Sequence, residues 1–499
     1  MTVAGDGRAA VAAGSAAPGR LALSSRGGRW LIAVTALGSG IVFLDGSVVN
    51  VALPSIARNL GGGFATLQWV MDGYLLTLSA LLLLGGALGD RRGRKRLFLI
   101  GLVIFTAASI ACGLAPTPAV LVAARLAQGI GGALLVPSSL ALIDGVIRAD
   151  DRGRAIGAWA GLSGVSSALG PLLGGWLVDT ISWRAVFLIN VPLAAIALAA
   201  TVRHVPESRM AAPGRLDAAG AVAATLGLGG VTIALIEVPM NGWTPVTIAA
   251  GVCGAALLVA FVVIESRHPA PLLPLTMFRS RQFAGANLLT FMIYGALSLG
   301  LFLLSLFLQM SMGYSATQTG LATLPITLEI LLLSTWVGAV TQRTGPRLAM
   351  VAGPLLAAAG FVLLSGIGLD TRYLSGVLPG VLVFGLGLAI TIAPLTSAVL
   401  ASVGDDRAGA ASGANNAIAR VAGLISVAVL PGVAGVEVRS AADAGSLSAG
   451  FGTSMLISAA MCAVGGLIAF LTVRSGISVR RNALPGVQHA CQPVVLRHD

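Results

Sequence analysis

Five ionisable residues of this chain stand inside long apolar stretches. They are Asp45, Asp72, Arg125, Glu329 and Arg420. An ionisable side chain at membrane depth costs about 2.5–3.5 kcal/mol to insert, and residues of this kind are usually functional. A carboxyl group beside an arginine can bind and release a proton as its surroundings change. This set of residues therefore predicts proton chemistry inside a membrane.

Three of the five residues are expected at similar depth on neighbouring helices. At a rise of about 1.5 Å per residue, Asp45 lies about 13 Å from the outer end of its helix. Asp72 and Arg125 each lie about 10 Å from the outer ends of theirs. Asp45, Asp72 and Arg125 would then titrate as one coupled set, and we assign them to a proton-coupling site. The alternative is a buried ion network that only fixes helix packing.

The other two residues lie in the second half of the chain. Glu329 is about 20 Å into its helix from the outer end, and no basic residue shares that stretch. It is our candidate for binding a cationic substrate or a second proton; the alternative is a protonated side chain bonded to a neighbouring helix. Arg420 lies near Asn415 and Asn416, which either line a cavity or form hydrogen bonds between helices.

The composition indicates an all-α, polytopic membrane protein. Of its 499 residues, 56% are hydrophobic and only 10% are charged, and the mean hydropathy is +0.92. Soluble domains carry about 25% charged residues. A helix needs about 20 apolar residues to cross a bilayer. Fourteen runs of this kind are present, at residues 31–53, 66–88, 97–115, 118–142, 155–178, 184–203, 217–237, 245–264, 283–308, 316–340, 347–368, 374–401, 408–434 and 452–473.

The basic residues orient these helices. If the N-terminus lies in the cytoplasm, 25 of the 31 Lys and Arg residues fall in cytoplasmic connections and tails, four fall outside and two fall within helices. Cytoplasmic loops of membrane proteins carry such an excess of Lys and Arg. We therefore expect a multi-pass protein of the inner (cytoplasmic) membrane with both termini in the cytoplasm. The net charge of +12 then reflects topology, and the expected partner is the lipid bilayer rather than a nucleic acid.

Several function classes are excluded by residues that the chain lacks. Its four cysteines form no C-x-x-C pair and its four histidines lie outside the apolar runs, so no metal site is expected. No G-x-x-x-x-G-K-[ST] segment is present, which excludes an ATP-driven pump. A membrane-embedded transferase would need acids and histidines gathered at one membrane face. We expect a monomer that is not an enzyme, takes no cofactor and draws energy from a proton gradient.

An internal repeat organises the chain. The segment Gly86–Lys95 (GALGDRRGRK) shares two glycines and an arginine with Gly338–Arg347 (GAVTQRTGPR) at an offset of 252 residues. The sequence D-D-R recurs at 150–152 and 405–407, an offset of 255. Parallel repeats of this kind place a substrate site between the two halves. The expected parts are a disordered cytoplasmic tail (1–29), a six-helix bundle (30–203), a linker with two inserted helices (204–282), a second six-helix bundle (283–474) and a cytoplasmic tail (475–499).

Five motifs follow one another along the first six apolar runs. They are LDGSVVNVALP (44–54), GALGDRRGRK (86–95), LVAARLAQGIGGA (121–133), GPLLGG (170–175) and WRAVFLINVP (183–192). In these motifs the chain resembles the major facilitator superfamily, specifically its fourteen-span drug:proton antiporter branch, over roughly residues 30–475. Two positions depart from the usual pattern: Ser47 replaces a threonine, and Ser166 stands where a glycine often precedes the fourth motif.

The resemblance implies a fold of two six-helix bundles plus two inserted helices. It also implies export of a hydrophobic or amphipathic drug or antibiotic in exchange for protons, and the alternative on the same fold is uptake of a metabolite by proton symport. Two groups of gating residues follow from it: Asp90, Arg91 and Arg94 as a charge latch, and Gly170, Pro171, Gly174 and Gly175 on a kinked helix. The glycines also serve helix packing, and part of the basic loop serves topology.

Overall fold

A computed structural model describes residues 21–209, 217–404, 407–436 and 444–473. Within these ranges the regular elements are helices. They form fourteen spans that are long and apolar enough to cross a membrane, and each span is one helix or two helices that join end to end. The predicted number of spans is therefore confirmed. The elements are α1 (Arg26–Leu60), α2 (Phe64–Arg92), α3 (Arg94–Gly113), α4 (Pro118–Val146), α5 (Ala149–Thr180), α6 (Ala185–Leu188), α7 (Asn190–His204), α8 (Ala218–Asn241), α9 (Pro245–Arg267), η1 (Leu275–Arg279), α10 (Arg281–Leu306), η2 (Phe307–Ser311), α11 (Ala316–Thr344), α12 (Pro346–Ser365), η3 (Tyr373–Val377), α13 (Leu378–Ala401), α14 (Ala408–Val433) and α15 (Ala444–Thr472).

The N-terminal segment is ordered from Leu21 onward, which differs from the expected disordered tail over 1–29. The N–H of Leu21 donates to the carbonyl of Val146 at 2.8 Å. The hydroxyl of Ser25 accepts from the N–H of Gly28 at 3.0 Å and caps α1. The backbone of Leu21 bonds Val146 at the end of α4 and Arg148 just before α5, which offsets the entropy cost of ordering this segment. Residues before 21 and the tail 475–499 lie outside the described ranges.

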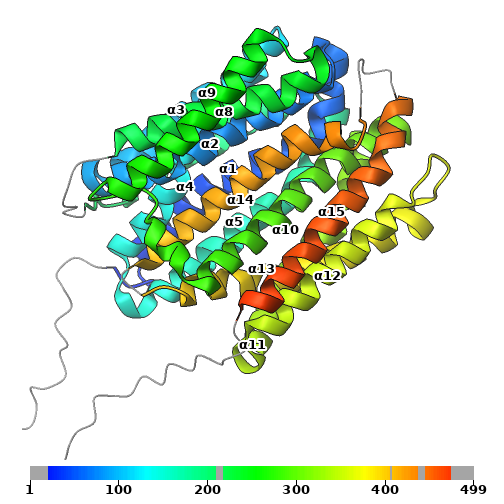
Figure 1. Cartoon of the computed structure of the whole chain (residues 1–499). Coiled ribbons are helices and arrows are strands. Elements are labelled where there is room, and N and C mark those ends of the chain that lie inside the picture. Colours follow the sequence, from blue (N-terminus) through cyan, green and yellow to red (C-terminus); the bar gives the residue numbers. More distant parts are fainter. Residues whose placement is uncertain (1–20, 210–216, 405–406, 437–443, 474–499) are drawn as a thin grey trace, which may run out of the picture.

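Two bundles repeat the same packing pattern. In the first, α1 packs against α5, while α2 and α3 both pack against α4; in the second, α10 packs against α14, while α11 and α12 both pack against α13. Gly93 and Gly345 stand at equivalent places, between α2 and α3 and between α11 and α12. Both have a positive φ, 106° and 82°, which glycine adopts without strain. Figure 1 shows the helices of the two bundles lying side by side.

One end of the molecule is closed by contacts between the bundles. The carboxylate of Asp179, in the last turn of α5, accepts the N–H groups of Ala316 (3.2 Å) and Thr317 (2.8 Å) at the start of α11. Free N–H groups at a helix start favour a negative charge. The hydroxyl of Ser305 on α10 donates to the carbonyl of Asn50 on α1 at 3.1 Å. These bonds hold both bundles together at the end where α5 finishes and α11 begins.

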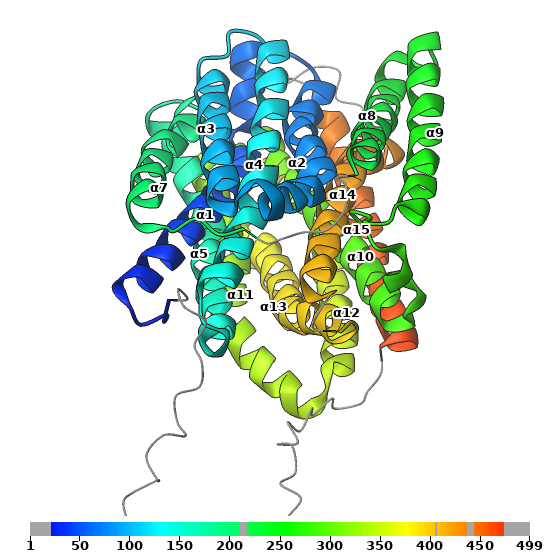
Figure 2. The same ribbon diagram turned by 90° about the vertical axis from the view of Figure 1, so that its left-hand side faces the viewer.

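The opposite end is open between α5 and α11. Gly153, Gly157, Gly161 and Gly164 lie on the first half of α5, and Gly338 lies on the last half of α11. Among the described residues, no atom lies within 4 Å of where a side chain would start on any of the five. Figures 1 and 2 both show these ends of α5 and α11 lying apart. Along α5 and α11 the bundles therefore meet at one end and separate at the other, while α2 and α14 stay in contact.

The inserted helices α8 and α9 pack at the side of the two bundles (Figure 2). The helix α8 lies against α2 and α14, one from each bundle. The indole of Trp69 on α2 donates to the carboxylate of Glu237 on α8 at 2.9 Å. Gly230 on α8 and Gly254 on α9 allow these two helices to approach at backbone distance. The inserted pair thus covers the line along which α2 and α14 meet.

Candidate functional site

A buried ion pair lies in the middle of the first bundle. Asp45 of α1 and Arg125 of α4 are both fully buried, and Oδ2 of Asp45 lies 2.5 Å from Nη1 of Arg125. Nε of Arg125 also donates to the carbonyl of Val70 on α2 at 2.9 Å. Two of the three residues predicted to share a site are therefore in direct contact.

Two amide side chains complete the coordination of Asp45, and a serine on a third helix accepts from both amides. Its Oδ1 accepts from Nε2 of Gln128 (2.7 Å) and Nδ2 of Asn190 (3.0 Å). Both amides also donate to the hydroxyl of Ser109 on α3, at 2.9 and 3.3 Å. Nη1 of Arg125 donates in addition to Oε1 of Gln128 at 2.8 Å. Three donors, from Arg125, Gln128 and Asn190, are therefore directed at the Asp45 carboxyl group.

Aromatic rings cover the guanidinium of Arg125. The ring of Tyr74 lies 4.2 Å from its Cζ, and the ring of Phe187 lies 5.8 Å away. Such cation–π contacts favour the charged group when water is absent. The hydroxyl of Tyr74 donates to the carbonyl of Val42 at 3.0 Å, which fixes the ring. Nη2 of Arg125 is buried and has no hydrogen-bond partner among the described residues, so the network keeps one uncommitted donor.

The helices place these groups through identifiable features. Asn190 is the first residue of α7, and the break between α6 and α7 follows from Pro192, whose ring cannot accommodate the carbonyl of Leu188. Gln128 follows Arg125 by one helical turn and therefore shares its face. Sequence reasoning quoted Gln128 and Asn190 within motifs without assigning them a role, and it missed Ser109 and Tyr74. A polar residue in the middle of an apolar run was the available signal for Ser109.

Asp72 does not join this network. It is fully buried on α2, and neither of its carboxylate oxygens has a hydrogen-bond partner among the described residues. Gln68, one turn earlier on the same face, donates to the carbonyl of Val427 on α14 at 2.6 Å. Asp72 therefore faces the line between the bundles, while Tyr74 turns toward Arg125. The three residues expected to form one site are therefore an ion pair, Asp45 with Arg125, and a separate acid, Asp72.

Glu329 is half-buried on α11 and packs against α13. One carboxylate oxygen, Oε2, lies beside Gly385, where any larger side chain would overlap it. This oxygen is buried and has no hydrogen-bond partner among the described residues. The isolation expected from the sequence is thus present, and the close packing of Glu329 depends on the glycine opposite.

The polar residues of α14 divide between two environments. The amide of Asn415 donates to Oδ1 of Asn287 (3.1 Å) and to the hydroxyl of Thr290 (2.6 Å), both on α10. Asn415 therefore forms hydrogen bonds between helices, one of its two expected roles. Arg420 is half-buried, and its Cζ lies 5.4 Å from the ring of Phe43 on α1, so it reaches across to the first bundle.

The latch residues Asp90 and Arg94 form an ion pair at the connection between α2 and α3. Their closest atoms are 2.8 Å apart, and Nη1 of Arg94 donates to the carbonyl of Ala141 on α4 at 2.7 Å. The carboxylate of Glu207 accepts the N–H of Lys95 at 3.0 Å and so caps α3. Arg91 is half-buried and takes part in no ion pair among the described residues. The pair of Asp90 and Arg94 and its contact with α4 lie within the first bundle, and Glu207 belongs to the linker that follows it.

The second gating group lies where α5 meets two other helices. Gly170 and Gly174 pack against Ser47 and Val48 of α1, and Gly175 packs against the backbone of α11 at Ala316. The carbonyl of Pro171 lies against Gly320 of α11. A side chain at any of these glycines would overlap its neighbour. Gly170, Pro171, Gly174 and Gly175 therefore allow the close helix approach that shuts the closed end.

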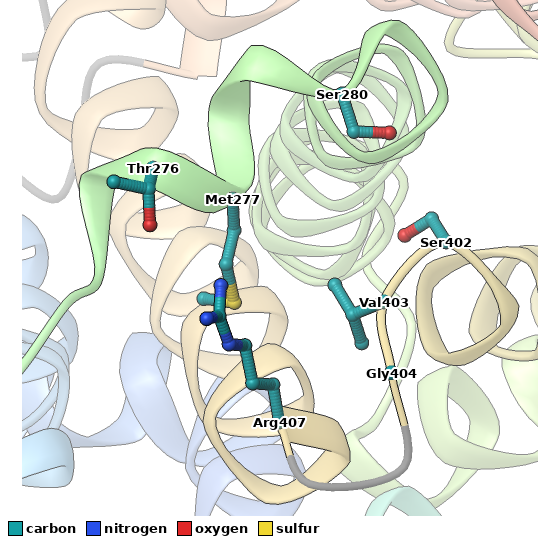
Figure 3. A pocket seen from close by; sticks show the side chains of 7 residues that line it. All are labelled: Thr276, Met277, Ser280, Ser402, Val403, Gly404 and Arg407. Atoms are coloured by element: carbon teal, nitrogen blue, oxygen red, sulfur yellow. The ribbon is translucent and has the colours of Figure 1, made fainter.

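A cavity of about 340 Å³ lies away from these residues, at the open end of the second bundle (Figure 3). It sits between η1 and the connection from α13 to α14, and Figure 3 shows the side chains that line it. It is lined by Thr276, Met277, Ser280, Ser402, Val403, Gly404 and Arg407. Because it lies within one bundle, it is not the space expected between the halves.

Comparison with known proteins places this geometry in context. The family model described as Major Facilitator Superfamily matches residues 35–427. The chain is 37% identical over 401 residues to the multidrug resistance protein Stp of Mycobacterium tuberculosis, covering 80% of this chain and 74% of that protein. It is 38% identical over 402 residues to the cephamycin export protein CmcT of Amycolatopsis lactamdurans, covering 79% and 82%. Among solved structures it is similar to a POT family transporter in complex with 5-aminolevulinic acid, with a TM-score of 0.68 at 15% identity and coverage of 90% and 98%, which supports the fold.

Proposed function

The chain belongs to the major facilitator superfamily, and on that premise we propose that it is a proton-coupled antiporter that exports hydrophobic or amphipathic drugs or antibiotics across the cytoplasmic membrane. Fold and family make it a multi-pass membrane transporter. The direction of transport is supported by its relatives, which are named for multidrug resistance and for cephamycin export.

The observation that carries proton coupling is the buried pair of Asp45 and Arg125. The carboxylate is sealed from solvent, and Arg125 is the cation that balances it. A proton on Asp45 would cancel the negative charge and leave the buried guanidinium unbalanced, so the ionic contact between α1 and α4 would weaken. A charge change that loosens two packed helices is a means of shifting a transporter between two states.

The proposed orientation determines which side of the membrane the closed end and the open end face. With the N-terminus in the cytoplasm, the closed end faces outward and the gap between α5 and α11 faces the cytoplasm. The contacts of Asp179 and Gly175 with α11 would then form the outer gate. This arrangement is suited to receive a substrate from the cytoplasm or the inner leaflet, and export requires the outer gate to open.

Reporter fusions test the orientation. Fusions after α7 near His204, after α9 near His268 and at the C-terminus should all report the cytoplasm, because 25 of the 31 Lys and Arg residues lie on that side. A periplasmic signal at the C-terminus would require an odd number of spans and would contradict the proposed topology.

Glu329→Gln is expected to reduce efflux of cationic compounds several-fold more than efflux of neutral ones. The carboxylate lies beside Gly385 with a buried oxygen that has no described donor, so a cation would supply its missing partner. Glutamine keeps the shape and removes the charge. Initial rates for a matched cationic and neutral pair of dyes measure the effect. An equal loss for both would assign Glu329 to proton coupling or to packing, and unchanged rates would remove it from the site.

A panel of toxic compounds tests the function as a whole. Cells that express the protein should survive higher concentrations of one class of hydrophobic or amphipathic compounds than cells without it, and they should accumulate less of those compounds. Collapse of the proton gradient should abolish the difference. If the protein instead makes cells more sensitive and raises accumulation, it works as an uptake system.

A further inference from the structure

Arg420 stands in the middle of a membrane span, and no described residue is its counter-ion. It is the thirteenth of the 26 residues of α14, about 18–20 Å from either end of the helix. Among the described residues its guanidinium group forms no ion pair and no hydrogen bond. A cation at this depth is costly, and such side chains usually face the interior of a bundle and mark the path of a substrate or an ion.

The face of α14 that carries Arg420 is turned toward the first bundle. Ala417 and Leu424, one turn before and one turn after it, both pack with the hydrophobic cluster of the first bundle. Gly423 lies close to Leu75 of α2. Arg420 is half-buried, and its nitrogen atoms remain accessible. Its exposed surface is therefore directed between the bundles, where a substrate is expected to bind, and not toward lipid.

The ring of Phe43 on α1 forms one side of this site. The ring is half-buried, and its centroid lies 5.4 Å from Cζ of Arg420. A cation–π contact involves the face of the guanidinium group and leaves the N–H donors at its edge free. That edge binds a carboxylate or another oxyanion through two parallel hydrogen bonds. The aromatic ring beside it suits an apolar group attached to the anion.

The acids of the membrane spans do not occupy this site. Asp45 belongs to the ion pair of the first bundle, and both carboxylate oxygens of Asp72 are buried without a partner among the described residues. The carboxylate of Glu329 packs against Gly385 of α13. None of these acids neutralises Arg420, so its charge is available to an anion that comes from outside the chain.

We propose that Arg420 and Phe43 bind the acidic group of the transported compound, and that the substrates are amphipathic anions in which a carboxylate or sulfonate adjoins an aromatic or apolar body. The proposal rests on the export proposed above and adds a charge to that class of compounds. Phe43 lies two residues before Asp45, so the anion binds beside the helix on which the proton is proposed to act. The site takes a negative group and is independent of the positive group considered for Glu329.

Binding of a matched pair of probes tests this charge preference. The probes are pyrenebutyrate, an aromatic carboxylate, and its uncharged primary amide; the protein is the full-length chain in nanodiscs of phosphatidylcholine. After correction for probe bound to empty nanodiscs, the wild type should bind the carboxylate more tightly than the amide. Arg420→Gln should weaken binding of the carboxylate by about 10- to 100-fold, the range for a lost hydrogen bond to a charged group, and should change binding of the amide little.

Three further variants separate charge from shape. Arg420→Lys keeps the charge without the planar fork, so it should retain the preference for the carboxylate at intermediate affinity. Phe43→Leu keeps the charge and removes the ring, so it should weaken both probes by a similar factor. Arg58→Gln is the matched control, because Arg58 is exposed near the end of α1 and donates to Ser55; loss of that charge should change neither affinity. Thermal midpoints show that each variant is folded.

Three results would overturn the proposal. The first is a wild type that does not prefer the carboxylate, or an Arg420→Gln protein that keeps the wild-type preference. The second is an equal loss of both probes in Arg420→Gln, which would assign Arg420 to the shape of the site. The third is loss of the wild-type preference in nanodiscs of phosphatidylglycerol with binding of the amide retained, which would assign the site to a lipid headgroup. Binding is measured without a gradient, so a failure of antiport would leave these affinities unchanged.

Discussion

Asp45→Asn is expected to insert in the membrane and bind substrate, yet to carry out no efflux driven by a pH gradient. Asparagine keeps the shape of the side chain but cannot exchange a proton, so the pair with Arg125 can no longer switch between charged and neutral forms. The rate of pH-driven transport in proteoliposomes, normalised to the amount of reconstituted protein, measures the effect. We expect that rate to fall to the level of empty liposomes.

The same substitution carries a structural cost that must be separated from coupling. Removing one partner of a buried ion pair typically destabilises a protein by about 3–5 kcal/mol, because the other charge remains. The double variant Asp45→Asn with Arg125→Gln removes both charges and should recover thermal stability without recovering coupled transport. Arg125→Lys should be nearly as inactive as Asp45→Asn, since one ammonium cannot bond Val70, Asp45 and Gln128 together.

Asp72→Asn provides the comparison within the same bundle. It breaks no ion pair among the described residues, so we expect a milder loss of transport or a changed pH optimum. If Asp45→Asn transports at the parental rate under a proton gradient, the assignment of Asp45 fails. Asp72 or Glu329 then becomes the leading proton carrier.

Gly175→Val is expected to open the closed end of the molecule and to abolish net efflux. The first side-chain carbon of residue 175 would overlap the backbone of Ala316 on α11, and a backbone cannot turn aside as a flexible side chain does. Overpacking of this kind costs about 1–3 kcal/mol. The overlap exists only while α5 and α11 touch, so the variant should shift the balance between the closed and open forms of this end by about 5- to 150-fold.

Spin labels across the closed end measure this shift. Labels on Ile181→Cys and Leu321→Cys, both exposed positions, report the separation of α5 and α11 once the native Cys253 and Cys491 are replaced by serine. Gly175→Val should add or enlarge a population at longer distance. Gly161→Val on the same helix is the matched control, because residue 161 faces open space and should leave the distance unchanged. An unaltered distance in Gly175→Val would mean that the glycine contacts do not hold the gate.

The number and type of helices were predictable because hydropathy reports a membrane helix directly. The ends of the helices were not predictable, since helices continue past the apolar run into the membrane–water interfaces. The first run was placed at 31–53, whereas α1 extends from Arg26 to Leu60. Ser25 and Gly61 end this helix through capping contacts that a window of hydropathy does not register.

Similar depth predicted that Asp45 and Arg125 could meet, but it predicted the same for Asp72, which lies apart from them. Depth along a helix does not specify which way a residue faces. On α2 both faces are apolar and buried, so no polar stripe marks the side toward α4. The structure resolves this through Gln68 and Tyr74, which contact α14 and Arg125 respectively.

For the gating glycines, the sequence predicted the kind of contact but not the partner helices. Their spacing predicted close helix contact, and the structure adds which helices are involved. Gly170 and Gly174 face α1 within the first bundle, while Gly175 faces α11 in the second. Contacts between segments some 140 residues apart depend on how the two bundles dock, which a repeat in the sequence does not specify. The same holds for Asp179, whose role at the start of α11 was not anticipated.

Proton movement driven by a substrate gradient tests antiport most directly. Liposomes that contain the protein, a pH-sensitive dye and a substrate identified by the panel are diluted into medium that has the same pH and no substrate. Antiport predicts that the lumen becomes acidic as substrate leaves, and that the double variant Asp45→Asn with Arg125→Gln shows no such change. A lumen that becomes alkaline as substrate leaves, or stays constant while substrate crosses, would contradict proton-coupled antiport.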